Sequence, residues 1–106
     1  MKVLLDENLP HDLRHSLVGH DAFNVAYMAW GGVRNGELLR RAGVAGFDAL
    51  LTLDLGIPFQ HNLATLPCAV VLLRAKSNRM QDLLPLVPEL LTCLGSLAPR
   101  SVAYVG

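Results

Sequence analysis

Three acidic residues of the sequence, Asp6, Glu37 and Asp54, are placed where they could act together. Asp6 and Asp54 each come at the end of a short run of apolar residues that is typical of a buried strand. Ligands bind outside the carboxyl ends of the strands in an open parallel sheet, so both carboxylates should lie at one edge of the domain. Glu37 lies in the first turn of a predicted helix and could enter between them. We therefore expect an acidic site at this edge.

Clustered carboxylates point to a particular chemistry. Carboxylates held close together repel one another, and a divalent cation removes that conflict. Hard oxygen ligands favour Mg²⁺ or Mn²⁺, which keep several waters and bind a phosphate of the substrate as well. Such a metal can activate a water and neutralise the charge that develops on a phosphodiester. The predicted reaction is metal-assisted hydrolysis of a phosphodiester.

Each acid also has a structural interpretation that the sequence leaves open. Asp6 could end a strand and cap the next helix, and Asp54 could form a turn ahead of Gly56. Glu37 would gain about 0.3–1 kcal/mol from the helix dipole in a first turn. Three acids are a weak signal in a chain of 106 residues, and their placement at strand ends is what favours a site.

Basic side chains near the same edge are candidates to hold RNA. Arg74 and Lys76 follow the predicted strand Ala69–Leu73 at its carboxyl end, and Arg34 precedes the helix that carries Glu37. Arginine forms a two-pronged contact with phosphate, although the same residues would also suit a solvated loop. The formal net charge is zero, so we expect any contact with nucleic acid to be local.

The elements that must position these residues alternate between strand and helix. Apolar runs predict strands over Lys2–Asp6, Phe23–Met28, Phe47–Leu53, Ala69–Leu73 and Ser101–Val105. Helices are predicted over Pro10–Val18, from Asn35 to Gly43 or Gly46, near Phe59–Thr65, and over Met80–Leu94 with a kink at Pro85 and Pro88. Alternation of this kind implies right-handed β-α-β units. The expected fold is α/β, with a mostly parallel sheet of about five strands in a three-layer α/β/α arrangement.

Length and composition set the broad class. The 106 residues suit one domain, 1–106, and a hydrophobic fraction of 52% against 17% charged suits a sheet buried on both faces. No apolar run approaches the roughly 20 residues that cross a bilayer, so no membrane association is expected. Asp6 interrupts the apolar start where a signal peptide needs an unbroken core, so we expect a cytoplasmic protein.

No other metal or redox motif is evident. Cys68 and Cys93 stand far apart in apolar settings, and we interpret them as small core residues. His11 and His15 are four residues apart and could bind zinc from one helix face, but no third ligand accompanies them in a known spacing, so exposed histidines are expected.

The chain resembles a family of small bacterial PIN-like proteins that open with a strand ending in Asp-Glu-Asn-Leu-Pro. That motif is Asp6–Pro10 here. The resemblance spans most of the chain, through Trp30-Gly31-Gly32, Asn35–Leu39, Gly46-Phe47-Asp48, Leu51–Asp54 and Gln60–Leu63.

The resemblance implies both a fold and an activity. Members of the family look like shortened relatives of the toxin ribonucleases of toxin–antitoxin pairs, whose PIN fold uses clustered acids and magnesium or manganese to cut RNA. By motif, Asp6 matches the first-strand acid, Glu37 the helix acid and Asp54 the acid of the Thr-x-Asp motif, with Glu7 as an added metal ligand. Asn62 lies in a matching motif and is a candidate RNA contact.

The expected partners follow from this resemblance and from composition. RNA is the expected substrate, and an antitoxin protein would accompany a toxin. The high apolar content is also compatible with a homodimer.

One departure from the pattern favours an alternative. Larger PIN nucleases commonly carry a further acid two residues after Thr-x-Asp, where this chain has Gly56. The alternative is a catalytically weak PIN-like module that binds RNA or a protein. A response-regulator-like domain ranks below both, because it would need a Lys after the fifth strand and no Lys lies beyond Lys76.

Overall fold

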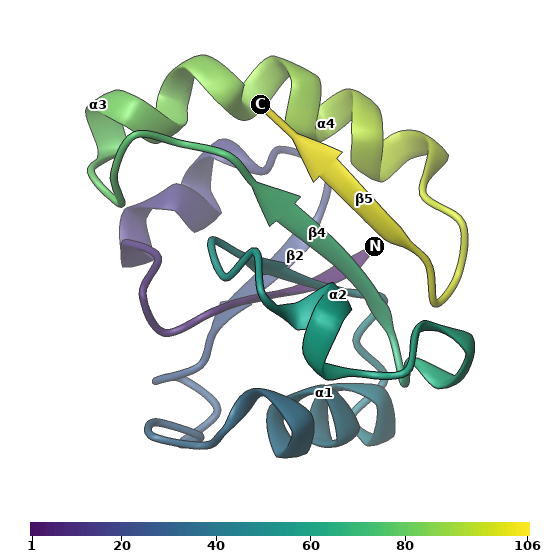
Figure 1. Cartoon of the computed structure of the whole chain (residues 1–106). Helices are drawn as coiled ribbons and strands as arrows, with labels where there is room; N and C mark the ends of the chain where they lie inside the picture. Colours follow the sequence, from purple (N-terminus) through teal and green to yellow (C-terminus); the bar gives the residue numbers. More distant parts are fainter.

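The short apolar runs of the sequence assemble into one sheet of five parallel strands (Figure 1). The structure is a computed structural model and describes residues 1–106. The strands are β1 (Lys2–Leu5), β2 (Asp21–Asn24), β3 (Ala49–Thr52), β4 (Ala69–Leu73) and β5 (Val102–Val105). They are hydrogen-bonded in the order β2-β1-β3-β4-β5, and every neighbouring pair is parallel. The predicted α/β class with a parallel sheet of about five strands is confirmed.

Helical segments follow each of the first four strands, directly or after a loop. They are the 3₁₀ helix η1 (His11–Ser16), α1 (Asn35–Val44), α2 (Ile57–Gln60), the 3₁₀ helix η2 (Leu63–Thr65), α3 (Met80–Leu83), the 3₁₀ helix η3 (Leu84–Leu86) and α4 (Val87–Ser96). α3, η3 and α4 follow one another without a loop. The 3₁₀ helix η3 breaks the α-helix at Pro85, and Pro88 lies in the first turn of α4, in agreement with the kink expected at the two prolines. None of these helices combines the length and apolar composition needed to cross a membrane.

Three predicted elements differ from the structure. The helix expected over Pro10–Val18 is the shorter 3₁₀ helix η1, which has no side-chain cap and is too short to propagate as an α-helix. The strand expected over Phe23–Met28 ends at Asn24, because the chain turns there and the Met28 amide donates to the Asn24 carbonyl. The helix expected near Phe59–Thr65 is instead α2 and η2, which the extended residues His61 and Asn62 separate.

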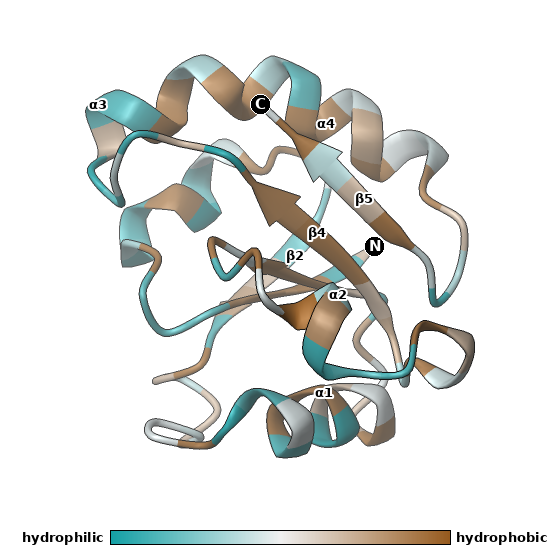
Figure 2. Ribbon diagram, in the orientation of Figure 1, coloured by the Kyte–Doolittle hydropathy of each residue, from teal (hydrophilic) through white to brown (hydrophobic).

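Each face of the sheet carries its own apolar core, because successive side chains of a strand point to opposite faces. Alternate strand residues pack with η1, α3 and α4 on one face and with α1 and α2 on the other. Figure 1 shows α3 and α4 on one side of the strands and α1 and α2 on the other, and Figure 2 shows the strongly apolar strand β4 between them. Cys68 is buried and Cys93 is partly buried, as expected, and burial raises the pKa of the Cys68 thiol to about 11.

The strand order fixes where a ligand should bind. The chain adds β2 on one side of β1, and the connection after β2 then crosses to place β3 on the other side, so the direction of strand addition switches between β1 and β3. Asp6 directly follows β1, and its backbone amide donates to the Leu51 carbonyl of β3 at 2.9 Å. Asp54 lies two residues beyond β3. Both predicted acids therefore lie at the switch point.

Candidate functional site

A buried hydroxyl joins the two acids at the switch point. The Thr52 Oγ1 donates to Asp6 Oδ2 at 2.6 Å and accepts from the Asp54 backbone amide at 3.0 Å. Thr52 is the last residue of β3 and is fully buried. Because a buried Thr in a strand has little rotational freedom, this link holds the carboxylate of one strand end in register with the backbone of the next.

The remaining contacts of both carboxylates are with uncharged donors. Asp6 Oδ1 accepts from the Glu7 amide at 2.7 Å, and Asp54 Oδ1 accepts from the Gly56 amide at 2.9 Å. Asp54 Oδ2 accepts from Asn35 Nδ2 at 2.6 Å. These bonds orient the two carboxylates and leave their charge uncompensated, and each oxygen retains a lone pair.

Asn35 has a different role from the helix cap that the sequence suggests. The residue before α1 is Arg34, whose side chain makes no capping bond, and Asn35 is the first helical residue. Its amide reaches across to Asp54 and so ties the start of α1 to the end of β3.

Glu7 is held by the turn that contains two glycines. The Gly32 amide donates to both carboxylate oxygens of Glu7, at 3.2 Å each. Gly32 has a φ of +76°, which glycine adopts without strain. The ring of the preceding Trp30 packs against Phe47 with centroids 6.1 Å apart, so Trp30 fills the core next to α1.

The acids face open space at the surface. Asp6, Glu7 and Asp54 line a hollow of about 530 Å³ with Asn8, Val33 and Asn35, which we name the acid hollow. A second hollow, of about 670 Å³, adjoins it; we name it the helix hollow, and its lining includes Arg34, Gln60 and His61. Val33 and Asn35 line both, so the two hollows form one groove.

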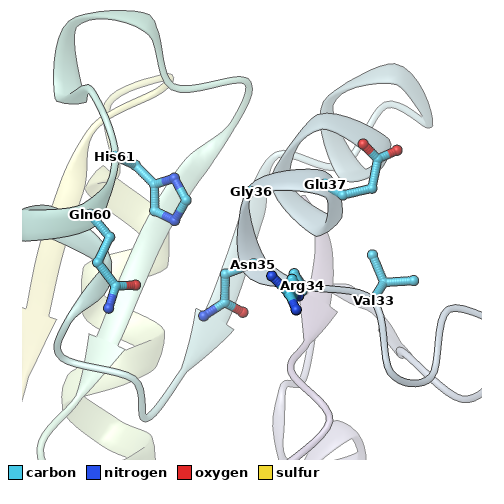
Figure 3. A pocket seen from close by; sticks show the side chains of 7 residues that line it. All are labelled: Val33, Arg34, Asn35, Gly36, Glu37, Gln60 and His61. Carbon is cyan, nitrogen blue, oxygen red and sulfur yellow. The ribbon is translucent and has the colours of Figure 1, made fainter.

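Glu37 lines the helix hollow and not the acid hollow, where Asp6 and Asp54 lie. Figure 3 shows its carboxylate turned away from Gln60 and His61, which lie across the helix hollow from it. Arg40 donates to both of its oxygens, one from Nε at 3.0 Å, and Arg41 Nε donates at 3.2 Å.

These arginines dominate the electrostatics of Glu37. The Arg40 hydrogen bonds first, and the Arg41 bond second, lower the pKa of Glu37 to about 2, and the same contact raises the pKa of Arg40. No group of three or more His, Cys, Asp or Glu side chains is placed to hold a metal ion. A catalytic role for Glu37 stays a prediction, and it would require the side chain to leave both arginines.

The predicted RNA contacts differ in where they lie. Arg34 lines the helix hollow, beside the acids. Arg74 lies toward β5, with its guanidinium 4.3 Å from the centre of the Tyr104 ring. Asn62 Oδ1 accepts from the Ala64 amide at 3.0 Å and so caps η2.

Lys76 lies in a loop that reaches the acid hollow. It is exposed, and Asn78 of the same loop donates from Nδ2 to the Asn8 carbonyl at 3.1 Å. Since Asn8 lines the acid hollow, the loop borders the site.

Sequence reasoning missed two residues that shape the site. In the sequence, Thr52 stands out only as part of the Thr-x-Asp motif. A Thr two positions before an acid at a strand end could have predicted the hydroxyl link between Asp6 and the Asp54 amide. His61 lies within the matching motif Gln60–Leu63, and its ring lies 3.3 Å from where a Cβ on Gly36 would stand and lines the helix hollow.

No family model, no curated protein and no solved structure matches this chain. The resemblance to PIN-like proteins therefore rests on the motifs, and function has to be argued from the site.

Proposed function

We propose that this protein is a metal-dependent ribonuclease of PIN-like type, which hydrolyses RNA phosphodiesters with Mg²⁺ or Mn²⁺ at the acid hollow. The observation that carries the proposal is the pair of acids, Asp6 and Asp54, fixed by Thr52 at adjacent strand ends and open to one hollow.

The side chains of the hollow have the chemistry that these metals prefer, although no three of its acids are placed together around one point. Asp6, Glu7 and Asp54 offer carboxylate oxygens, the hard ligands that Mg²⁺ and Mn²⁺ prefer. The ion pairs of the structure all belong to Glu37, so these three carboxylates have no cationic side chain within 4.0 Å. Negative charge without a partner is a reason to bind a cation.

Each residue of the groove would then have its own role in the reaction. A bound metal would supply an activated water and neutralise developing charge on the phosphate. Asp6 and Asp54 would hold it, with Glu7 beside them, while Thr52 and Asn35 keep the two Asp carboxylates in place. Arg34 and Lys76 would bind backbone phosphates on either side of the scissile bond.

Two observations favour a second candidate, a PIN-like module that binds RNA or a protein without cutting. Glu37 is engaged by two arginines, and Gly56 stands where larger PIN nucleases carry a further acid. The Gly56 position also has little room, because a Cβ there would lie 3.1 Å from Asp54 Oδ1. An antitoxin partner, a homodimer and a cytoplasmic location remain parts of the proposal.

Cleavage of end-labelled single-stranded RNA with Mg²⁺ or Mn²⁺ tests the proposal. Asp6→Asn and Asp54→Asn should each reduce cleavage by more than the roughly 100-fold that loss of a mere supporting group costs. Asp21→Asn removes an exposed acid at the opposite end of β2 and is the matched control. Cleavage by Asp6→Asn at the wild-type rate would contradict the proposal. Binding of RNA without cleavage by the wild-type protein would favour the module.

Glu37→Gln decides the role of the third predicted acid. Loss of cleavage would mean that Glu37 leaves its arginines to join the site. Unchanged cleavage would limit it to the ion pairs on α1.

A further inference from the structure

The helix hollow is lined by polar side chains that the protein itself leaves free to bind a ligand. Gln60 and His61 lie on one side of it, and Arg34 and Asn35 lie on the other (Figure 3). Asn35 is engaged by Asp54, whereas the side chains of Gln60 and His61 form no hydrogen bond within the protein. The volume of about 670 Å³ is inside the range of roughly 300–1,000 Å³ for sites that hold small molecules.

The ring of His61 is positioned by contact with a glycine of α1. Gly36 is the second residue of that helix. A Cβ there would stand 3.3 Å from His61 Cε1 and 3.8 Å from His61 Nδ1, and no atom of another element besides these two comes within 4 Å. The ring therefore meets α1 with one edge, and the missing side chain of Gly36 makes room for it. A face of the ring is left for a planar ligand to stack on.

Gln60 lies directly beside Asp54 of the acid hollow. The two side chains flank Gly56, because a Cβ there would stand 3.2 Å from Gln60 Nε2 and 3.1 Å from Asp54 Oδ1. Val33 and Asn35 line both hollows and so connect them. An RNA strand with a phosphate in the acid hollow would therefore place a neighbouring base in the helix hollow.

The charges of the helix hollow suit RNA. Its only acid, Glu37, is paired with Arg40 and Arg41, so the hollow has no unpaired carboxylate to repel a phosphate. Arg34 adds an exposed guanidinium that forms no ion pair. A local positive charge of this kind attracts the RNA backbone.

The two free side chains match the way in which proteins read single-stranded RNA. Unpaired bases stack on aromatic rings, including that of histidine, and bond polar side chains through their exposed edges. The amide of glutamine has a donor and an acceptor side by side, and with both it bonds N6 and N7 of adenine. A histidine for stacking and a glutamine for the base edge therefore favour adenine.

We propose that the helix hollow binds an adenine base of single-stranded RNA, in the nucleotide next to the phosphate that is cut. Gln60 bonds N6 and N7 of the base, His61 stacks on its ring, and Arg34 contacts the backbone. The inference rests on the proposed function and deepens it, since it names the RNA sequence that the same groove selects.

Binding of short labelled oligouridines that carry one variable base tests the inference, with EDTA present so that no RNA is cut. Fluorescence anisotropy should show that the adenine oligonucleotide binds about fivefold or more tightly than those with guanine, cytosine or only uracil. His61→Ala should weaken binding of the adenine oligonucleotide by about fivefold or more, because the base loses its stacking partner.

Gln60→Glu tests the bonds to the base edge. A carboxylate only accepts, so this variant should lose the preference for adenine and favour cytosine, whose N4 amino group donates. Misfolding cannot produce such a gain for cytosine relative to adenine. Gln81→Glu makes the same chemical change at an exposed residue of α3, on the other face of the sheet from α1 (Figure 1), and should keep the preference for adenine.

Equal affinity of the wild-type protein for the four oligonucleotides, a preference for another base, or no binding would each overturn the inference. An unchanged preference in Gln60→Glu would overturn it as well. Metal-dependent cleavage with no preference for adenine would remove the base site and keep the nuclease. Adenine-selective binding that depends on Gln60, in a protein that cuts no RNA, would keep the base site and remove the nuclease.

Discussion

Replacing Thr52 with Val tests the link between the two acids. The substitution keeps the shape of a fully buried side chain and removes the hydroxyl that bonds Asp6 Oδ2 and the Asp54 amide. A hydrogen bond to a charged group contributes about 1.5–3 kcal/mol and one between neutral groups about 0.5–1.5 kcal/mol. Because Asp6 is partly exposed to water, the lower part of each range applies, and the free energy of unfolding should fall by about 2–3 kcal/mol.

Urea unfolding of the Thr52→Val and Thr52→Ser proteins measures this loss. Ser retains the hydroxyl and loses one buried methyl group, which costs about 0.8 kcal/mol. Thr52→Val should therefore unfold at a lower urea concentration than Thr52→Ser, with a similar slope. If Thr52→Val proved as stable as Thr52→Ser, the hydroxyl would not hold the two strand ends together, and our description of the site would be wrong.

Two further predictions concern α1 and its surroundings. Because the arginines lower the pKa of Glu37 from 4.5 to about 2, their contribution is present above pH 4.5 and is lost as the pH falls to 2. Glu37→Gln should thus lower stability at pH 7 but not at pH 2, and an equal effect at both pH values would contradict this. Gly43→Ala would place a Cβ 2.8 Å from Pro67 Cβ, and overpacking costs of about 1–3 kcal/mol should outweigh the helix gain of about 1 kcal/mol. A Cβ at Gly95 would meet nothing within 4 Å, so Gly95→Ala should stabilise the protein. If Gly43→Ala and Gly95→Ala shifted the urea midpoint in the same direction, the packing argument would be wrong.

The sheet could be predicted because its strands are short apolar runs buried on both faces. The strand predicted over Ala69–Leu73 has the same bounds as β4, because every side chain in it is buried and the charged residue Arg74 follows it. The connection after β1 could not be predicted in the same way, because Leu9, Leu13 and Leu17 have the spacing of an α-helix, yet only Leu13 lies within η1 and all three are buried.

The placement of Asp6 and Asp54 at one edge followed from strand ends in a parallel sheet, which is a property of topology. Glu37 was harder, because its direction depends on Arg40 and Arg41 on the next turn, which compete for its carboxylate. The burial of Asn24 could not be predicted from the sequence, because it depends on the register between β1 and β2.

A crystal structure with Mn²⁺, located by its anomalous scattering, tests the central claim most directly. We predict a peak in the acid hollow with oxygens of both Asp6 and Asp54 within about 2.5 Å of it, within the range of metal–oxygen bonds in proteins. A saturated crystal with no peak there, and with both carboxylates bonded only to Thr52, Asn35 and backbone amides, would contradict the claim.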